Sequence, residues 1–201
     1  AEVGVVRAVH EGLGEAVAQL AVRPAAPGVR VDDRHALLAG EVAHRLTKHQ
    51  VVPERIQVRA DNKRWRYPHW SYGDATVDQY CSIAAVGRRH GLCVAAARTV
   101  CFGQPPTELR GAYHRSMLAQ ATGMYFSQAN WELFEIWNRV QRIYEKFGYP
   151  DEWQNADQAE IIGYFVNEVP LVPNSELRAR SRMAIDWHPF IGPAVCGDTV
   201  L

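Results

Sequence analysis

Two near-continuous apolar runs constrain the fold of this chain more than any other feature. They occupy residues 81–86 and 92–102 and flank a short polar segment at 87–91 that begins and ends with glycine. Strands that are apolar at consecutive positions are typical of the centre of a sheet, where both faces are covered. We therefore expect a hairpin of two central strands, around which the rest of the chain is built.

Helical and strand patterns alternate in blocks around this hairpin. Apolar residues recur at helical spacing in four segments, 3–20, 32–49, 107–124 and 130–147. The third of these is expected to pack through one stripe, formed by Leu109, Tyr113, Met117, Gln120 and Met124. Further strands are predicted at 56–60, 161–166, 183–191 and 194–201. This order favours an α+β fold over a strict βαβ alternation.

The pattern of residues 56–60 differs from that of the central hairpin. Ile56, Val58 and Ala60 are apolar, and the residues between them are polar. Alternation with a period of two predicts a strand with one buried and one polar face. We therefore interpret this segment as a half-buried strand.

The composition limits the classes of partner. A chain of 201 residues has the size of one domain. Its 22 Lys and Arg balance its 22 Asp and Glu, which argues against nucleic acid or an anionic membrane as the main partner. The chain contains no apolar run of about 18 residues, the length that marks a membrane-spanning helix. The four cysteines show no CxxC spacing, so we expect reduced thiols in a cytoplasmic protein.

An aromatic and basic segment at 63–72 is the most unusual part of the sequence. It combines four aromatic residues, three cationic residues and His69 within ten positions. One interpretation is an exposed turn whose aromatic rings fold onto the core. The other is one wall of a pocket, and the residues alone leave both open.

Three segments carry a resemblance to a known superfamily. They are 91–109 with Arg98-Thr99, 161–170 with Glu168-Val169-Pro170, and 183–201 with Met183, His188-Pro189 and Asp198-Thr199. In this order they resemble the strand motifs of the pita-bread superfamily, which includes creatinase, aminopeptidase P and methionine aminopeptidase. The resemblance implies one catalytic-type domain over 1–201, with a curved antiparallel sheet covered by helices on its outer face. In relatives an N-terminal domain often precedes it.

The same resemblance implies that the metal site has been lost. Metallopeptidases of the superfamily hold two metal ions with two Asp, one His and two Glu. The matching positions in this chain are Ala84, Ala95, Glu160, His188 and Gly197. None of the five keeps its residue type, so we expect no metal and no cofactor. Glu160 and His188 remain an alternative site for a single ion, which two ligands would hold weakly.

Creatinase works without metal and uses a histidine as its acid/base group, and His69 is the best match to that residue here. The resemblance also directs His188 and Glu160 into the pocket, so these three are the predicted catalytic residues. Asp186 lies two residues before His188, hence on the same face of a strand, where it can orient His188 or bind a substrate ammonium. Tyr164 and Trp70 are predicted to form apolar walls for the substrate.

These observations support a metal-independent enzyme acting on a small amino-acid-derived substrate. The reaction would be hydrolysis of a C–N bond, or a lyase or cyclisation step in specialised biosynthesis. The first alternative is a non-catalytic relative that kept the fold for binding or assembly. The second is a true metalloenzyme whose acidic residues converge elsewhere in the fold. The resemblance further implies a homodimer, with residues 65–72 as a candidate contact.

Overall fold

A computed structural model describes residues 34–61, 72, 73 and 75–201 of the chain. The helix predicted at 3–20 and the candidate residues His69 and Trp70 lie outside these ranges. The first described elements are α2 (His35–Lys48), β1 (Val52–Ala60), β2 (Tyr80–Arg89), β3 (Leu92–Cys101), α3 (Thr107–Phe126) and α4 (Leu133–Lys146). The remainder are the short 3₁₀ helix η1 (Glu152–Asn155) and the strands β4 (Ala159–Ile162), β5 (Val169–Pro170), β6 (Ala184–Trp187), β7 (Phe190–Ile191), β8 (Ala194–Val195) and β9 (Gly197–Val200).

The predicted central hairpin is confirmed as the antiparallel pair β2 and β3. Its turn consists of His90 and Gly91, which adopt positive φ angles of 52° and 85°. Strand β1 pairs with the other edge of β2, and Asp61 ties their ends together. The Asp61 carboxylate accepts hydrogen bonds from the backbone N–H groups of residues 78, 79 and 80. This contact holds the end of β1 against the start of β2.

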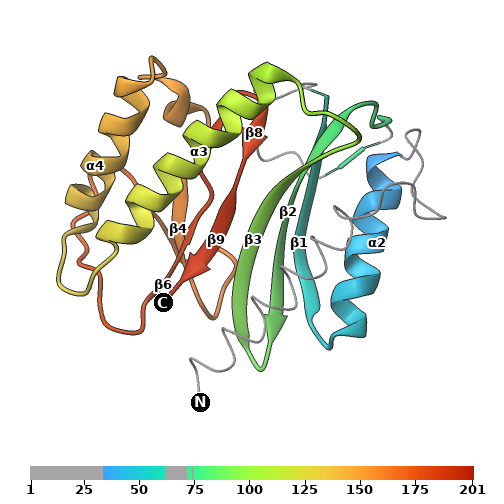
Figure 1. Ribbon diagram of the computed structural model, residues 1–201. Helices are drawn as coiled ribbons and strands as arrows, with labels where there is room; N and C mark the ends of the chain where they lie inside the picture. Colours follow the sequence, from blue (N-terminus) through green and yellow to red (C-terminus); the bar gives the residue numbers. More distant parts are fainter. Residues whose placement is uncertain (1–33, 62–71, 74) are drawn as a thin grey trace.

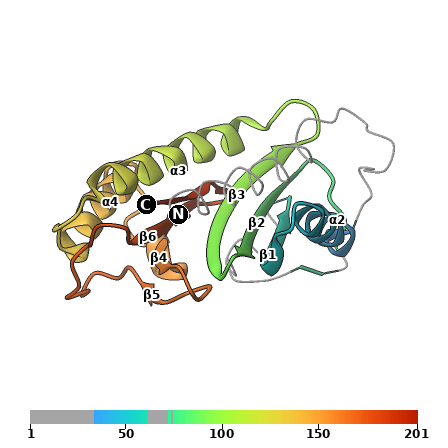
Figure 2. The same cartoon turned by 90° about the horizontal axis from the view of Figure 1, so that it is seen from below.

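One curved sheet organises the molecule. Its strand order is β1-β2-β3-β9-β6-β4-β5, and β7 and β8 form a separate two-stranded sheet. Helix α2 covers the outer face beside β1 and β2, whereas α3 and α4 cover it beside β9, β6 and β4 (Figure 1). The view from below shows the helices on the outside and the strands curving around an inner space (Figure 2). The expected α+β architecture, an antiparallel sheet with helices on its outer face, is therefore confirmed.

Each half of the sheet has its own apolar core on the outer face. Helix α2 buries Leu38, Val42 and Leu46 against outward-facing residues of β1, β2 and β3. Helix α4 buries a stripe at helical spacing, which consists of Leu133, Ile136, Trp137, Val140 and Tyr144. The polar residues of the alternating strand β1 therefore lie on the inner face of the sheet.

The buried face of helix α3 overlaps only partly with the predicted stripe, because Leu109 and Gln120 belong to both. Met117 is 43% exposed, and the buried face consists mainly of smaller residues, namely Leu109, Ala112, Ser116, Ala119, Gln120 and Gly123. A Cβ atom at position 123 would lie 2.4 Å from the Trp187 ring. Small side chains occupy this face because the helix lies directly on that ring.

The C-terminal strands are shorter than the sequence pattern predicted. The run at 161–166 ends after Ile162, because the Glu168 carboxylate accepts hydrogen bonds from the N–H groups of Tyr164 and Phe165 and turns the chain. The run at 183–191 is divided into β6 and β7 by Pro189, which has no N–H group for a ladder. The pattern of apolar residues does not predict that the strands end after Ile162 and before Pro189.

No helix among the described residues is both long and apolar enough to cross a membrane. All four cysteines are free, as expected. Burial raises the pKa of Cys81 to about 12 and that of Cys196 to about 11, so these thiols stay protonated and are poor nucleophiles.

Candidate active site

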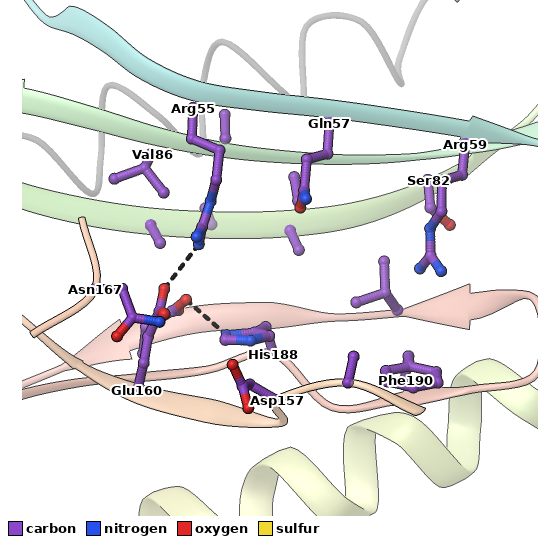
Figure 3. Close-up of a pocket in the computed structure, with 18 residues that line it drawn as sticks. Arg55, Gln57, Arg59, Ser82, Val86, Asp157, Glu160, Asn167, His188 and Phe190 are labelled. Atoms are coloured by element: carbon purple, nitrogen blue, oxygen red, sulfur yellow. Dashed lines mark hydrogen bonds and ion pairs between the residues drawn. The ribbon is translucent and has the colours of Figure 1, made fainter. Parts of the chain in front are cut away.

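The inner face of the sheet surrounds a cavity of about 230 Å³. Strand β1 directs Arg55, Gln57 and Arg59 into it, because alternate residues of a strand share one face (Figure 3). The residues in register with them on β2 are Val86, Ala84 and Ser82, and these also line the cavity. The polar face of the predicted half-buried strand is thus directed at the cavity.

His188 and Asp186 form a hydrogen-bonded pair on the opposite wall. Asp186 belongs to β6 and His188 follows that strand directly. The distance from Nδ1 of His188 to Oδ2 of Asp186 is 2.8 Å. Burial by itself lowers the pKa of His188, but the charge and hydrogen bond of Asp186, aided by Glu160, outweigh it and raise that pKa overall. The pair therefore favours the protonated imidazole.

Glu160 adds a buried carboxyl group beside this pair. It is 1% exposed and lies on β4 in register with Asp186. Nη2 of Arg55 donates to its Oε1 over 2.7 Å (Figure 3). Burial raises the pKa of Glu160, and the opposite charge of Arg55 limits the increase. Because Arg55 belongs to β1 and Glu160 to β4, this ion pair joins two distant parts of the sheet across the cavity.

The residues at the family's metal positions do not fit a two-ion centre. Ala84 and Ala95 line the cavity and offer no donor atom. Gly197 has no side chain, and a Cβ there would lie 2.9 Å from Cβ of His188. Two of the five positions, Glu160 and His188, carry donors, which is too few for two ions.

Three residues of the cavity could in principle hold a single metal ion. Asp186 joins Glu160 and His188, and one donor atom from each lies within 4.8 Å of the others. Oδ1 of Asp186 is buried and has no hydrogen-bond partner within the described part of the chain. However, Arg55 already supplies a positive charge to Glu160, and it would repel a metal cation at the same place.

The structure thus brings together three of the six predicted site residues, Glu160, Asp186 and His188. Tyr164 lies elsewhere: it is 65% exposed and lines a second depression with Cys93 and Glu168, outside the cavity that contains His188. His69 and Trp70 lie outside the described residues, so their roles stay predictions.

Two further residues stabilise the surroundings of the cavity. Nη2 of Arg98 lies 2.5 Å from Oδ1 of Asp198, an ion pair between β3 and β9. Trp187 is fully buried, with its ring N–H donating to Ser127.

Sequence reasoning missed the cationic side chains of β1. Arg55 and Arg59 both line the cavity. The polar positions of the alternating strand were the signal, but alternation alone does not show whether a polar face borders solvent or a cavity. In a curved sheet, the concave face is the one that encloses the site.

Comparisons with known proteins confirm the pita-bread fold implied by the resemblance. A model of metallopeptidase family M24 matches residues 5–197. The prolidase of Pyrococcus furiosus has a similar structure, with a TM-score of 0.82 at 17% identity over 99% of this chain and 59% of that one. The dipeptidase PepE of Mycobacterium ulcerans matches with a TM-score of 0.83 at 17% identity, over 99% of this chain and 53% of that one. Aminopeptidase P of E. coli matches with a TM-score of 0.80 at 17% identity, over 98% of this chain and 52% of that one.

Identities this low establish the fold alone, and this chain spans between 52% and 59% of the length of these three structures. No curated protein sequence matches it. The family model, however, covers almost the whole chain. The chain therefore belongs to metallopeptidase family M24.

Proposed function

We propose that this protein is a metal-independent, creatinase- or aminopeptidase-like enzyme that acts on a small amino-acid-derived substrate. The observation that carries the proposal is the hydrogen-bonded pair of His188 and Asp186 beside Glu160. The group lies in a cavity lined by Ala84 and Ala95, two positions at which the resemblance implies carboxylate ligands in the metallopeptidases. Proton transfer remains available to such a site without a two-ion centre.

The chemistry follows from the hydrogen bonds. Because Asp186 engages Nδ1 of His188, Nε2 is the atom left to exchange a proton with a substrate. In hydrolysis of a C–N bond, Glu160 would take a proton from water while the water oxygen bonds to carbon. His188 would give its proton to the departing nitrogen, and the two groups then return to their starting states. A lyase or cyclase step would use the same two groups without water.

Three further roles belong to the proposal. His69 is the acid/base residue implied by the creatinase resemblance, and Trp70 and Tyr164 are the implied substrate contacts. Because Tyr164 is exposed beside a second depression, we propose that it contacts only a part of the substrate that extends beyond the cavity. Homodimerisation and a cytoplasmic location are likewise proposed from the family.

The test combines metal analysis with turnover by the full chain. The substrates would be Xaa-Pro dipeptides and N-substituted amino acids, a choice guided by the prolidase and dipeptidase among the similar structures. We expect turnover that survives a chelator and gains nothing from added Mn²⁺. Stoichiometric Mn, Co or Zn that is required for turnover would contradict metal independence.

Substitution of the histidine tests the assigned group. His188→Asn should lower kcat at least about 100-fold, the usual contribution of a positioned acid or base. His114→Asn is the matched control, because His114 is exposed on α3, and it should leave turnover unchanged. Full activity of His188→Asn would remove His188 from the mechanism.

The alternative of a non-catalytic binding or assembly protein predicts no defined cavity, or one filled by the chain's own side chains. A cavity of about 230 Å³ lined by charged residues favours the enzyme. Consistent absence of turnover, with His188 and its partners intact, would favour the alternative.

A further inference from the structure

Arg59 carries a positive charge that no group among the described residues neutralises. Its Nη1 atom is buried and has no hydrogen-bond partner there. The side chain lines the cavity and extends into it from β1 (Figure 3). Burial lowers the pKa of Arg59 to about 10, which still leaves it protonated at neutral pH. A buried charge without a partner is costly, so its retention calls for an anion at this place.

The other charged groups of the cavity mostly have partners, which makes Arg59 distinct. Arg55 is paired with Glu160 at 2.7 Å, and Asp186 is paired with His188 at 2.8 Å. The third carboxylate lining the cavity, Asp157, has no ion pair with Arg59. Among the described residues, the ion pairs therefore leave the Arg59 guanidinium and the Asp157 carboxylate of this cavity without a direct partner.

The strand register places Arg59 one step along the cavity from the level of His188. Gln57 is in register with Ala84, Ala84 with Ala97, and Ala97 with Gly197. Gly197 in turn lies against His188, so His188 and Gln57 are at the same level of the cavity. Arg59 is two residues beyond Gln57 on the same face, a step of about 7 Å.

We propose that Arg59 binds the carboxylate of an amino-acid-derived substrate and thereby holds the adjoining C–N bond beside His188. This proposal rests on the proposed function and names the class of substrate for the same cavity. A guanidinium presents a planar pair of donors that matches a carboxylate or a phosphate. A carboxylate suits the site better, because Asp157, Glu160 and Asp186 line the same small cavity and repel a dianion more than a monoanion.

Binding of two matched probes to the full chain tests the proposal. N-acetylglycine carries the carboxylate, and N-acetylglycinamide replaces it with a neutral amide of the same size. By calorimetry or NMR titration we expect the acid to bind at least tenfold more tightly than the amide. Equal binding of the two probes, or tighter binding of inorganic phosphate than of N-acetylglycine, would overturn the proposal.

Variants identify the residue responsible. Arg59→Met should abolish the preference for the acid, whereas Arg110→Met, which removes an exposed arginine of α3, should keep it. A preference that persists in Arg59→Met would overturn the assignment. If Arg59→Met does not fold, Arg59→Lys keeps the charge without the planar pair of donors and should bind the acid at least threefold more weakly; unchanged binding would again overturn it.

The outcome for the subsite is separable from that for the enzyme. An Arg59-dependent preference for the acid in a protein without turnover would support the subsite and contradict the proposed function. Turnover in a protein whose acid preference does not depend on Arg59 would support the enzyme and overturn the subsite. His188→Asn should retain the preference, since the proposed anion site does not include His188.

Discussion

The pKa of His188 is raised mainly by Asp186. Asp186 supplies both a hydrogen bond and a negative charge, and together with Glu160 these outweigh burial and raise the pKa of the imidazole. A group whose pKa is raised on folding stabilises the folded state below its unfolded pKa, here about 6.5. That stabilisation disappears as the pH rises through the folded pKa.

Substituting Asp186 by Asn should therefore lower the pKa of His188. NMR titration of the imidazole would give the midpoint in each protein. The free energy of unfolding should fall by about 2 kcal/mol at pH 6 and by less at pH 9, since the charged hydrogen bond is lost only where His188 is protonated. Asp157→Asn, in the same cavity, is the control and should move the midpoint less. A midpoint unchanged by Asp186→Asn would contradict this account.

Gly197 is the residue that makes room for His188. A Cβ at this position would lie 2.9 Å from Cβ of His188 and 3.0 Å from Cβ of Ala97. Gly197→Ala should therefore destabilise the fold by about 2 kcal/mol, as overpacking usually does. Gly40→Ala, in α2 with nothing within 4 Å, should instead stabilise by up to about 1 kcal/mol. Urea unfolding of both variants measures the difference; equal effects would show that position 197 is not crowded.

Among single residues, the sequence predicted the anionic and imidazole groups better than the cationic ones. Asp186, His188 and Glu160 could be found because family motifs fixed their positions on strands. Arg55 and Arg59 could not, because a polar residue on an alternating strand has the same pattern whether it faces water or a concave cavity. Only the curvature of the sheet distinguishes the two.

At the scale of elements, helix α3 illustrates how distance between layers overrides hydrophobicity. Periodicity correctly predicted a helix over 107–124, but Met117 of the predicted stripe is exposed, and only Leu109 and Gln120 of that stripe are fully buried. The buried face contains Ala112, Ser116, Ala119 and Gly123 because the helix lies close to the sheet. Hydrophobic pattern alone cannot report how near a helix will come to its neighbour.

The close approach makes a direct prediction. Gly123→Ala would place Cβ 2.4 Å from the Trp187 ring, so α3 must move, at a cost of about 3 kcal/mol. Gly111→Ala is the matched control in the same helix, because its Cβ would meet only the Arg115 side chain, at 3.6 Å. It should stabilise the protein by up to about 1 kcal/mol. Similar thermal unfolding of the two variants would argue against tight packing of α3.

At the scale of the whole molecule, the fold class and the order of helices and strands followed from the sequence, whereas the closure of the sheet did not. Arg55 and Glu160 are 105 residues apart and belong to β1 and β4. Four strands separate β1 from β4 in the sheet. Their ion pair exists because the sheet curves until these strands face each other, and no local pattern encodes that distance.

The closing ion pair should make stability depend on pH in a defined direction. Burial raises the pKa of Glu160 in the folded protein, so its ionisation weakens the fold as the pH rises from the unfolded pKa through the folded one. The positive charge of Arg55 reduces this loss of stability, because it stabilises the ionised form of Glu160. Arg55→Met should cost about 2 kcal/mol at pH 7, less than a fully buried pair because the Arg55 side chain is 32% exposed. At pH 4 the cost should be small.

A double-mutant cycle isolates this interaction. Glu160→Gln in the Arg55→Met background removes the uncompensated charge, so the double variant should be more stable at pH 7 than Arg55→Met alone. Arg88→Met is the control, because Arg88 pairs with Glu54 where both side chains are more exposed, and it should cost less than about 1 kcal/mol. If Arg55→Met lost the same stability at pH 4 and pH 7, or if the two substitutions were additive, the ion pair would not be what holds the two edges of the cavity together.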